Sequence, residues 1–220
     1  MDNSEAKEKK EARRCYIITA YLEGALTAII APDASDYIIC ADAGYEKALA
    51  AGLRPDLVIG DFDSTKIIAP DGARTAFIRH PIQKDESDTF LCVKHAVDQG
   101  FRDIIIAGGL GGRLDHTVSN LQTLARFAEK GRTIALTDAK NTAAVLTDSS
   151  VTIPKKEGLC LSLFSLSDVS AGVTTEGLRY PLRNATLTNT YPIGLSNEFS
   201  AEEARVEVRS GKLLVVLSGD

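Results

Sequence analysis

The sequence of 220 residues predicts an α/β protein with two domains, an N-terminal parallel sheet and a small C-terminal all-β domain. Two observations predict this fold class. In the first half, short apolar runs alternate with helical segments, which is typical of a parallel sheet covered by helices on both faces. After about residue 141 convincing helices are lacking, and short strand-like segments with closely spaced turns favour a sandwich or barrel.

The strands expected in the first half are short, continuous apolar runs, as buried parallel strands usually are. They lie at residues 16–20, 37–41, 57–60, 104–107 and 133–136. Helices are expected over residues 45–51, 87–99 and 115–130, and each is followed by a glycine, the residue that most often ends a helix. The last helix carries an apolar stripe at the helical repeat of 3.6 residues. This alternation predicts a Rossmann-like first domain.

In the second half, strands are expected near residues 159–164, 206–208 and 213–217. The last two flank Arg209-Ser210-Gly211-Lys212, which indicates a hairpin turn. We place the domain boundary near residues 141–150. The predicted organisation is a charged, flexible tail over residues 1–14, an α/β domain over residues 15–145, and a β domain over residues 146–220.

Composition excludes several classes of protein. The net charge of −5 argues against a general nucleic-acid binder, which usually has a basic face. No apolar run approaches the roughly 18 residues that span a bilayer, so no membrane association is expected. The four cysteines form no CxxC pair, which argues against a zinc site. Three of them lie at or within apolar runs, where reduced core thiols are usual, and we expect a cytoplasmic protein.

The first candidate site is Gly60-Asp61-Phe62-Asp63-Ser64, directly after an apolar strand. In an extended segment, Asp61 and Asp63 point the same way and repel each other unless a cation lies between them. Mg²⁺ prefers oxygen ligands and often uses one or two carboxylates together with phosphates and water. The alternative is a solvated turn in which Asp63 or Ser64 caps a neighbouring segment.

The second candidate site is Lys84-Asp85-Glu86-Ser87-Asp88, at the start of a predicted helix. Residues three apart in a first helical turn lie on one side, which applies to Asp85 and Asp88. The alternative is that these acidic residues only complement the helix dipole. Four acidic side chains in two strand-end loops nevertheless favour a metal site, because open α/β sheets bind ligands at that edge.

The third candidate site begins with the glycines of residues 108–112 and continues into Arg113, Asp115 and His116. Glycines allow backbone N–H groups to approach an anion closely, and Arg113 offers a forked donor for phosphate. The alternatives are a flexible turn, Asp115 as an ordinary helix cap, and His116 as a surface residue. The segment lacks the Walker and dinucleotide-binding patterns, so it predicts a nucleotide site of another kind.

In this order, the three motifs resemble those of the thiamine pyrophosphokinases. The matching segments are Ala41-Asp42-Ala43-Gly44, Pro55-Asp56-Leu57-Val58-Ile59-Gly60-Asp61-Phe62-Asp63-Ser64, Asp85-Glu86-Ser87-Asp88, Gly111-Gly112-Arg113-Leu114-Asp115-His116, Thr175-Glu176-Gly177-Leu178-Arg179-Tyr180-Pro181-Leu182 and Leu195-Ser196-Asn197-Glu198. The resemblance extends over roughly residues 15–218. Two of these motifs, GDFDS and GGRxDH, are specific in combination although each is weak alone.

The resemblance implies an enzyme that uses ATP and Mg²⁺ to pyrophosphorylate thiamine, and a homodimer that holds thiamine where its two subunits meet. It implies that Asp61, Asp63 and Asp88 bind Mg²⁺ and pyrophosphate. Residues implied near the nucleotide are Asp42, Asp85, Gly111, Gly112, Arg113 and His116. Asp115 would hold the thiamine pyrimidine or the metal region, and residues implied at the thiamine are Tyr180, Ser196 and Asn197.

Three positions depart from the family pattern. Ala43 stands where a second glycine is common, Ser87 stands where threonine is usual, and Tyr180 replaces the tryptophan of some members. Either aromatic ring stacks on a cationic heterocycle, so the last change bears on affinity rather than on the type of site.

The implied reaction is attack of the thiamine hydroxyl on the β-phosphorus of ATP, with AMP leaving and with Asp88 or Asp115 accepting the proton. Two rival functions stay open. An apolar strand followed by DxDS is also found in haloacid-dehalogenase-type phosphatases, where Asp61 would be the nucleophile and Asp63 the acid. A module that only senses nucleotide or thiamine is the second rival. The phosphatase interpretation leaves GGRxDH unexplained, and a sensor needs no acidic metal cluster.

Overall fold

The structure is a computed structural model that describes residues 13–61, 75–80 and 85–219. The tail predicted over residues 1–14 lies outside these residues except for its last two. Within the described part, the chain is mixed α/β, and none of its helices is long and apolar enough to cross a membrane. The chain divides into two compact units. The first is Met1–Thr123 with Leu136–Ala139, and the second is Leu124–Ala135 with Lys140–Asp220.

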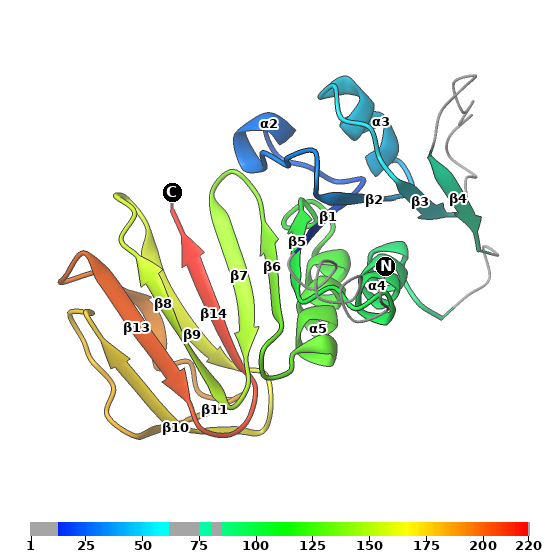
Figure 1. The fold of residues 1–220 in the computed structure, drawn as a ribbon. Helices are drawn as coiled ribbons and strands as arrows, with labels where there is room; N and C mark the ends of the chain where they lie inside the picture. Colours follow the sequence, from blue (N-terminus) through cyan, green and yellow to red (C-terminus); the bar gives the residue numbers. More distant parts are fainter. Residues whose placement is uncertain (1–12, 62–74, 81–84, 220) are drawn as a thin grey trace, which may run out of the picture. The chain divides into compact units, whose positions relative to one another are not determined.

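The first unit is built on five strands in the order β5-β1-β2-β3-β4, and each neighbouring pair is parallel (Figure 1). Their bounds are β1 Arg14–Ile18, β2 Tyr37–Ala41, β3 Leu57–Gly60, β4 Ala76–Arg79 and β5 Asp103–Ala107. The sequence predicted all of them except β4. That strand has three consecutive apolar residues, Ala76-Phe77-Ile78, but none of its residues is buried.

Helices cover both faces of this parallel sheet (Figure 1). The helices are α2 (Leu26–Ile29), α3 (Gly44–Ala50) and α4 (Asp88–Asp98), followed by α5 (Leu114–Phe127). Tyr16 and Ile18 of β1 belong to the core that α2 and α3 close, while the intervening Cys15 and Ile17 are also fully buried. Because successive residues of a strand point to opposite faces, burial on both sides explains the continuous apolar runs.

Helix α4 begins with a side-chain cap. The Ser87 hydroxyl accepts a hydrogen bond from the Phe90 amide at 3.2 Å, and the Ser87 backbone is extended, as an N-cap requires. Threonine at this position would supply the same oxygen, so the Ser87 departure leaves the cap intact.

We expect Ser87→Ala to lower the free energy of unfolding by about 1 kcal/mol, because the first turn of α4 loses a partner for one amide. Urea denaturation followed by circular dichroism measures this change. Ser87→Thr is the matched control and should stay within about 0.5 kcal/mol of the wild type, since it retains the cap. Equal stability of the alanine variant and the wild type would contradict the capping role.

Helix α5 ends at Phe127, three residues before the predicted end. The Arg132 Nη1 donates to the Phe127 carbonyl oxygen at 3.0 Å, which supplies a partner at the helix terminus. Gly131 then takes a positive φ of 78°. Gly131 therefore does not end the helix as predicted, but lies in the short turn that follows it. Strand β6 (Thr133–Thr137) follows, where the sequence predicted a strand.

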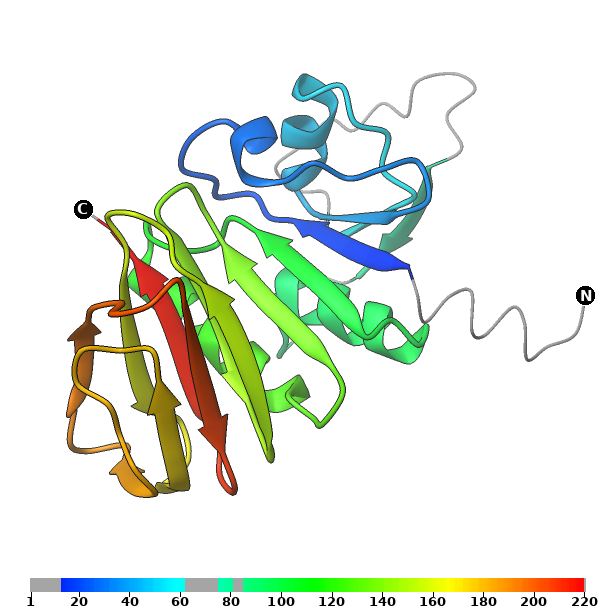
Figure 2. The same cartoon turned by 60° about the vertical axis from the view of Figure 1, so that its left-hand side comes forward.

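The second unit contains two antiparallel arrays of strands, β12-β9-β14-β7 and β11-β10-β13-β8 (Figure 2). The strands are β7 Asn141–Leu146, β8 Ser149–Pro154, β9 Cys160–Ser165, β10 Val169–Glu176, β11 Ala185–Thr188, β12 Gly194–Asn197, β13 Glu203–Val208 and β14 Leu213–Ser218. One core receives side chains from both arrays. Val206 and Val208 come from β13, and Val215 and Leu217 come from β14.

The hairpin predicted at Arg209-Ser210-Gly211-Lys212 is wrong. Strand β13 pairs with β8 and β10, whereas β14 pairs with β7 and β9, so the turn connects the two arrays. The amides of Arg209 and Ser210 donate to the Ala171 carbonyl oxygen at 3.1 and 3.2 Å. A turn sequence indicates a reversal of the chain, but it does not determine which strand each flank pairs with.

Candidate functional site

A cavity of about 290 Å³ in the first unit contains several of the predicted site residues. Asp42, Asp88, Gly111, Arg113 and His116 line it. The remaining lining residues are Thr19, Ala20, Tyr21, Ala41, Ser87, Thr89, Gly109 and Asn120. The cavity borders the residues that follow β1, β2 and β5, which is the sheet edge where open α/β folds bind ligands.

Asp42 and Asp61 follow the neighbouring parallel strands β2 and β3. The Asp42 amide donates to the Ile59 carbonyl oxygen at 2.9 Å, and Asp42 has the uncommon φ of 45°. A Cβ atom placed on Gly60 would lie 3.1 Å from the Asp42 Cβ and 3.2 Å from its Oδ1. The backbone just before Asp61 therefore passes directly beside the Asp42 carboxylate. Asp63 lies outside the described residues.

Only part of the second acidic motif lines the cavity. Asp88 is half-buried, begins α4 and lines the cavity, whereas Asp85 and Glu86 are exposed. Ser87 also lines the cavity and caps α4. The helix cap thus orients the first turn so that Asp88 faces the site.

The glycine segment is not a loose turn. Gly108, Gly109, Gly111 and Gly112 all have positive φ, between 62° and 87°, a conformation that L side chains rarely adopt. Three of their amides donate within the protein: Gly108 to the Thr137 carbonyl, Gly109 to the Tyr21 carbonyl, and Gly111 to the Thr117 hydroxyl. We expected these amides to face an anion, but all three already donate hydrogen bonds within the protein. Arg113 lines the cavity and is the charged donor that this segment offers to an anion.

Arg113 and Asp115 form a two-pronged ion pair. The Arg113 Nη2 lies 2.6 Å from the Asp115 Oδ2, and its Nε lies 3.1 Å from Oδ1. Hydrogen bonding from Arg113 lowers the pKa of Asp115, with a smaller contribution from the His116 amide. The pair is largely exposed, so it contributes little stability. A carboxylate with a lowered pKa is a weaker proton acceptor, and Asp115 is absent from the cavity lining.

Two buried polar residues that the sequence analysis did not select hold the glycine segment in place. The Thr19 hydroxyl donates to the Tyr21 carbonyl oxygen at 2.8 Å, and the Asn120 Nδ2 donates to the Gly109 carbonyl oxygen at 2.8 Å. Both residues are almost fully buried. A polar residue at the end of an apolar run, as Thr19 is, is the sequence pattern that indicates such a role.

The predicted residues of the second unit also lie near one another. The Asn197 Oδ1 accepts from the Tyr180 amide at 3.1 Å, and its Nδ2 donates to the Tyr180 carbonyl oxygen at 2.8 Å. Ser196 has a positive φ of 54°, and its amide donates to the Ser162 hydroxyl at 2.9 Å. Tyr180 is 62% exposed, so it is not a core aromatic, and the Arg179 guanidinium lies 5.5 Å from its ring centre.

Carboxylates are the main candidates for a metal ion in the first unit. Within residues 13–61, 75–80 and 85–219, no group of three His, Cys, Asp or Glu side chains is arranged to hold a metal ion. Mg²⁺ usually needs only one or two protein carboxylates, because phosphate oxygens and waters complete its shell. Asp42 and Asp88 on one cavity, with Asp61 on the adjacent strand end, are compatible with such a shared site.

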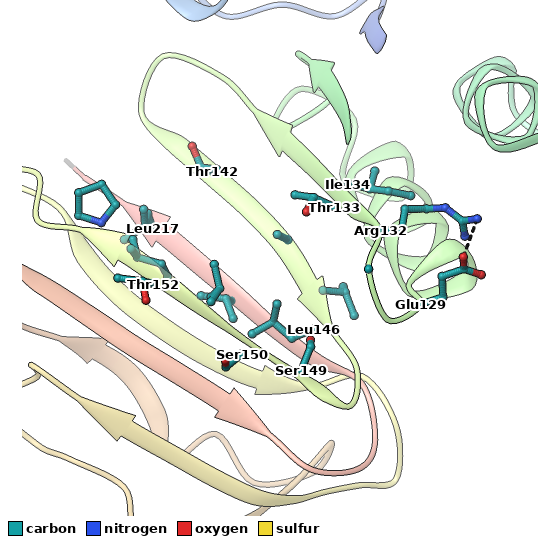
Figure 3. A pocket seen from close by; sticks show the side chains of 17 residues that line it. Glu129, Arg132, Thr133, Ile134, Thr142, Leu146, Ser149, Ser150, Thr152 and Leu217 are labelled. Atoms are coloured by element: carbon teal, nitrogen blue, oxygen red, sulfur yellow. Dashed lines mark ion pairs between the residues drawn. The ribbon is translucent and has the colours of Figure 1, made fainter. Parts of the chain in front are cut away.

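A second cavity, of about 340 Å³, lies within the second unit and is lined mainly by apolar and hydroxyl side chains of β6, β7, β8 and β14 (Figure 3). The charged residues on its lining are Glu129 and Arg132, which pair with each other at 2.9 Å. In Figure 3 the Arg132 side chain extends toward Glu129. None of the predicted site residues lines this cavity.

Two family models match the chain. The model for the thiamin pyrophosphokinase catalytic domain matches residues 31–136, and the model for the thiamin pyrophosphokinase vitamin B1 binding domain matches residues 149–213. The first match contains most of the lining of the smaller cavity, and the second contains Tyr180, Ser196 and Asn197.

Relatives and solved structures of the same name agree with these matches. A thiamine pyrophosphokinase of Bacillus subtilis (strain 168) is 28% identical over 183 residues, which cover 81% of this chain and 86% of the relative. The crystal structure of thiamine pyrophosphokinase from Bacillus subtilis superimposes with a TM-score of 0.85 at 26% identity, covering 94% of this chain and 100% of that chain. The structure of a thiamin pyrophosphokinase from Geobacillus thermodenitrificans gives a TM-score of 0.81 at 26% identity, with 94% and 98% coverage.

Proposed function

The chain belongs to the thiamin pyrophosphokinase family, and from this premise we propose that it transfers the pyrophosphoryl group of ATP to the hydroxyl of thiamine. The products are thiamine diphosphate and AMP. One observation carries the proposal: Asp42, Asp88 and Arg113 line the same cavity of the first unit. All three lie within the residues that the catalytic-domain model matches.

The first unit, which we class as Rossmann-like, binds ATP and Mg²⁺. We assign the same fold class and the same ligands to the α/β domain predicted over residues 15–145. Asp61, Asp63 and Asp88 would hold the metal. Mg²⁺ would neutralise charge on the polyphosphate when bound. Asp42 and Arg113 flank the nucleotide, with Asp85, Gly111, Gly112 and His116 in supporting positions. The parallel strands and the positions of these residues at their carboxyl ends support this arrangement.

The reaction is a displacement at the β-phosphorus of ATP. The thiamine oxygen forms a bond to that phosphorus, and the bond from the phosphorus to the α,β-bridging oxygen breaks, so AMP leaves with that oxygen. The hydroxyl proton goes to a carboxylate. We assign this role to Asp88 rather than Asp115, because Asp88 lines the cavity and Asp115 does not. Arg113 stabilises negative charge on the phosphates, and positioning supplies much of the rate enhancement.

The β domain predicted over residues 146–220, which we class as a β-sandwich, binds thiamine through Tyr180, Ser196 and Asn197. The functional protein is a homodimer in which thiamine lies at the subunit interface. Exposed large apolar side chains support an interface: Leu114 and Val118 in the first unit, and Tyr191, Ile193 and Leu195 in the second. Free thiols at all four cysteines are consistent with a cytoplasmic location.

Incubation with ATP, Mg²⁺ and thiamine, followed by chromatography, tests the reaction. The expected products are AMP and thiamine diphosphate in equal amounts, and AMP appears only when thiamine is present. Inorganic phosphate released from a monoester without ATP would instead indicate the phosphatase interpretation. Binding of ATP and thiamine without AMP formation would indicate a sensor.

The Asn197 contacts lead to a separate prediction for thiamine binding. Asn197→Ala removes the two hydrogen bonds that hold the Tyr180 backbone. We expect the KM for thiamine to rise about tenfold, because each such bond contributes on the order of 1 kcal/mol to the bound arrangement. The KM for ATP should stay within about twofold. Asn189→Ala, an exposed asparagine of the same unit, is the control. A parallel rise of both KM values would indicate a general structural defect.

A further inference from the structure

Tyr21 lies at the cavity of the first unit, although no sequence motif includes it and it precedes the residues matched by the catalytic-domain model. Its backbone is held firmly. The Tyr21 carbonyl oxygen accepts from the Gly109 amide and from the Thr19 hydroxyl, both at 2.8 Å. The segment after β1 is thereby tied to the segment after β5, and the position of the Tyr21 side chain follows from this connection.

One side of the Tyr21 ring rests against the glycine turn. A Cβ atom on Gly112 would lie 2.7 Å, 2.9 Å and 3.1 Å from three atoms of the ring. A Cβ atom on Gly111 would lie 3.3 Å from the phenol oxygen and 3.4 Å from the nearest ring carbon. Any side chain at Gly112 would displace the ring. Glycine is therefore needed at both positions for two reasons: a side chain would crowd the Tyr21 ring, and the turn has positive φ there.

The rest of the ring is accessible. Tyr21 is 43% exposed and lines the same cavity as Asp42, Asp88 and Arg113. Those charged side chains suit the phosphates and metal of a nucleotide, but they offer no flat apolar surface. A planar base requires such a surface, because stacking on an aromatic ring supplies much of its binding energy.

We propose that Tyr21 is a specificity-determining residue whose ring stacks on the purine base of ATP, with the Gly111-Gly112 turn as its support. The inference rests on the proposed function for the identity of the nucleotide. Thiamine is the less suitable occupant, because the vitamin B1 binding model matches residues 149–213 and the ring belongs to the other unit. Tyr21 contacts the base and not the reacting atoms.

Steady-state kinetics of Tyr21→Ala and Tyr21→Phe test the stacking role. The alanine variant should raise the KM for ATP about tenfold, leave the KM for thiamine within about twofold, and reduce the preference for ATP over CTP, since pyrimidines stack more weakly. The phenylalanine variant keeps the ring and should behave like the wild type. An unchanged KM for ATP would overturn the proposal. So would equal losses for ATP, CTP and thiamine, which would assign Tyr21 to support of the turn alone.

A direct binding measurement separates this inference from the reaction. The chain contains no tryptophan, so Tyr21→Trp introduces a single indole at the cavity. ATP should change the indole emission in the absence of thiamine, whereas inorganic tripolyphosphate should not. Tyr191→Trp, at an exposed tyrosine of the second unit, is the control and should not respond. Two outcomes would overturn the proposal, whether or not thiamine diphosphate is formed. In the first, tripolyphosphate changes the indole emission as much as ATP does. In the second, ATP does not change the emission at concentrations that saturate the variant in equilibrium dialysis.

Discussion

Asp88→Asn is expected to lower kcat by about 100-fold or more, which is typical when a side chain that stabilises charge or transfers a proton in the reaction is removed. The substitution keeps the size of the side chain and removes its negative charge. Asp88 begins α4 and lines the cavity that also contains Asp42 and Arg113. The loss should therefore appear in turnover and in the Mg²⁺ requirement, while the fold is retained.

The control for this variant is Glu86→Gln, which makes the same change of charge two residues earlier. Glu86 is exposed and does not line the cavity. The kcat of the Glu86→Gln variant should therefore stay within about twofold of the wild-type value. Circular dichroism and urea denaturation establish that both variants are folded. Turnover of Asp88→Asn within tenfold of the wild type at saturating Mg²⁺ would remove Asp88 from the catalytic site.

Gly44→Ala is expected to destabilise the first unit by about 1–3 kcal/mol, the usual range for overpacking a well-packed interior. A Cβ atom on Gly44 would lie 2.1 Å from the Ile18 carbonyl oxygen and 2.8 Å from its carbonyl carbon. Ile18 ends β1 and is fully buried, so the backbone cannot move away as a flexible side chain would. Replacing a helical glycine with alanine elsewhere usually gains about 0.5–1 kcal/mol, but the clash outweighs that gain here.

The adjacent position supplies the control for Gly44. Ala43 has an ordinary φ of −62°, so glycine is not required there, and the departure from the family pattern at this residue has no structural cost. Ala43→Gly should lower the free energy of unfolding by no more than about 1 kcal/mol. Urea midpoints measured by circular dichroism compare the two variants. A Gly44→Ala protein as stable as the wild type would show that α3 can shift away from β1.

The acidic and glycine-rich motifs were accessible from the sequence because they are local. Asp42 and Asp88 each occupy a recognisable position beside a strand or helix, and parallel strands bring such positions to one edge. Strand β4 was missed, because three apolar residues, Ala76-Phe77-Ile78, are too short a run to distinguish a strand from a loop by pattern alone. The sequence did not show that Asp85 is exposed while Asp88 lines the cavity. That difference depends on the capped first turn of α4.

The alternation of buried parallel strands with helices can be read from the sequence, because strands buried on both faces need continuous apolar runs, and such runs are local. The sequence also predicted site residues of which Asp42, Asp88 and Arg113 line one cavity. Tertiary structure alone decided that Tyr21 rests on Gly112, and that β13 and β14 pair with different partners. Each of these depends on where a segment distant in the sequence lies, and on the direction of a side chain, neither of which a local pattern specifies.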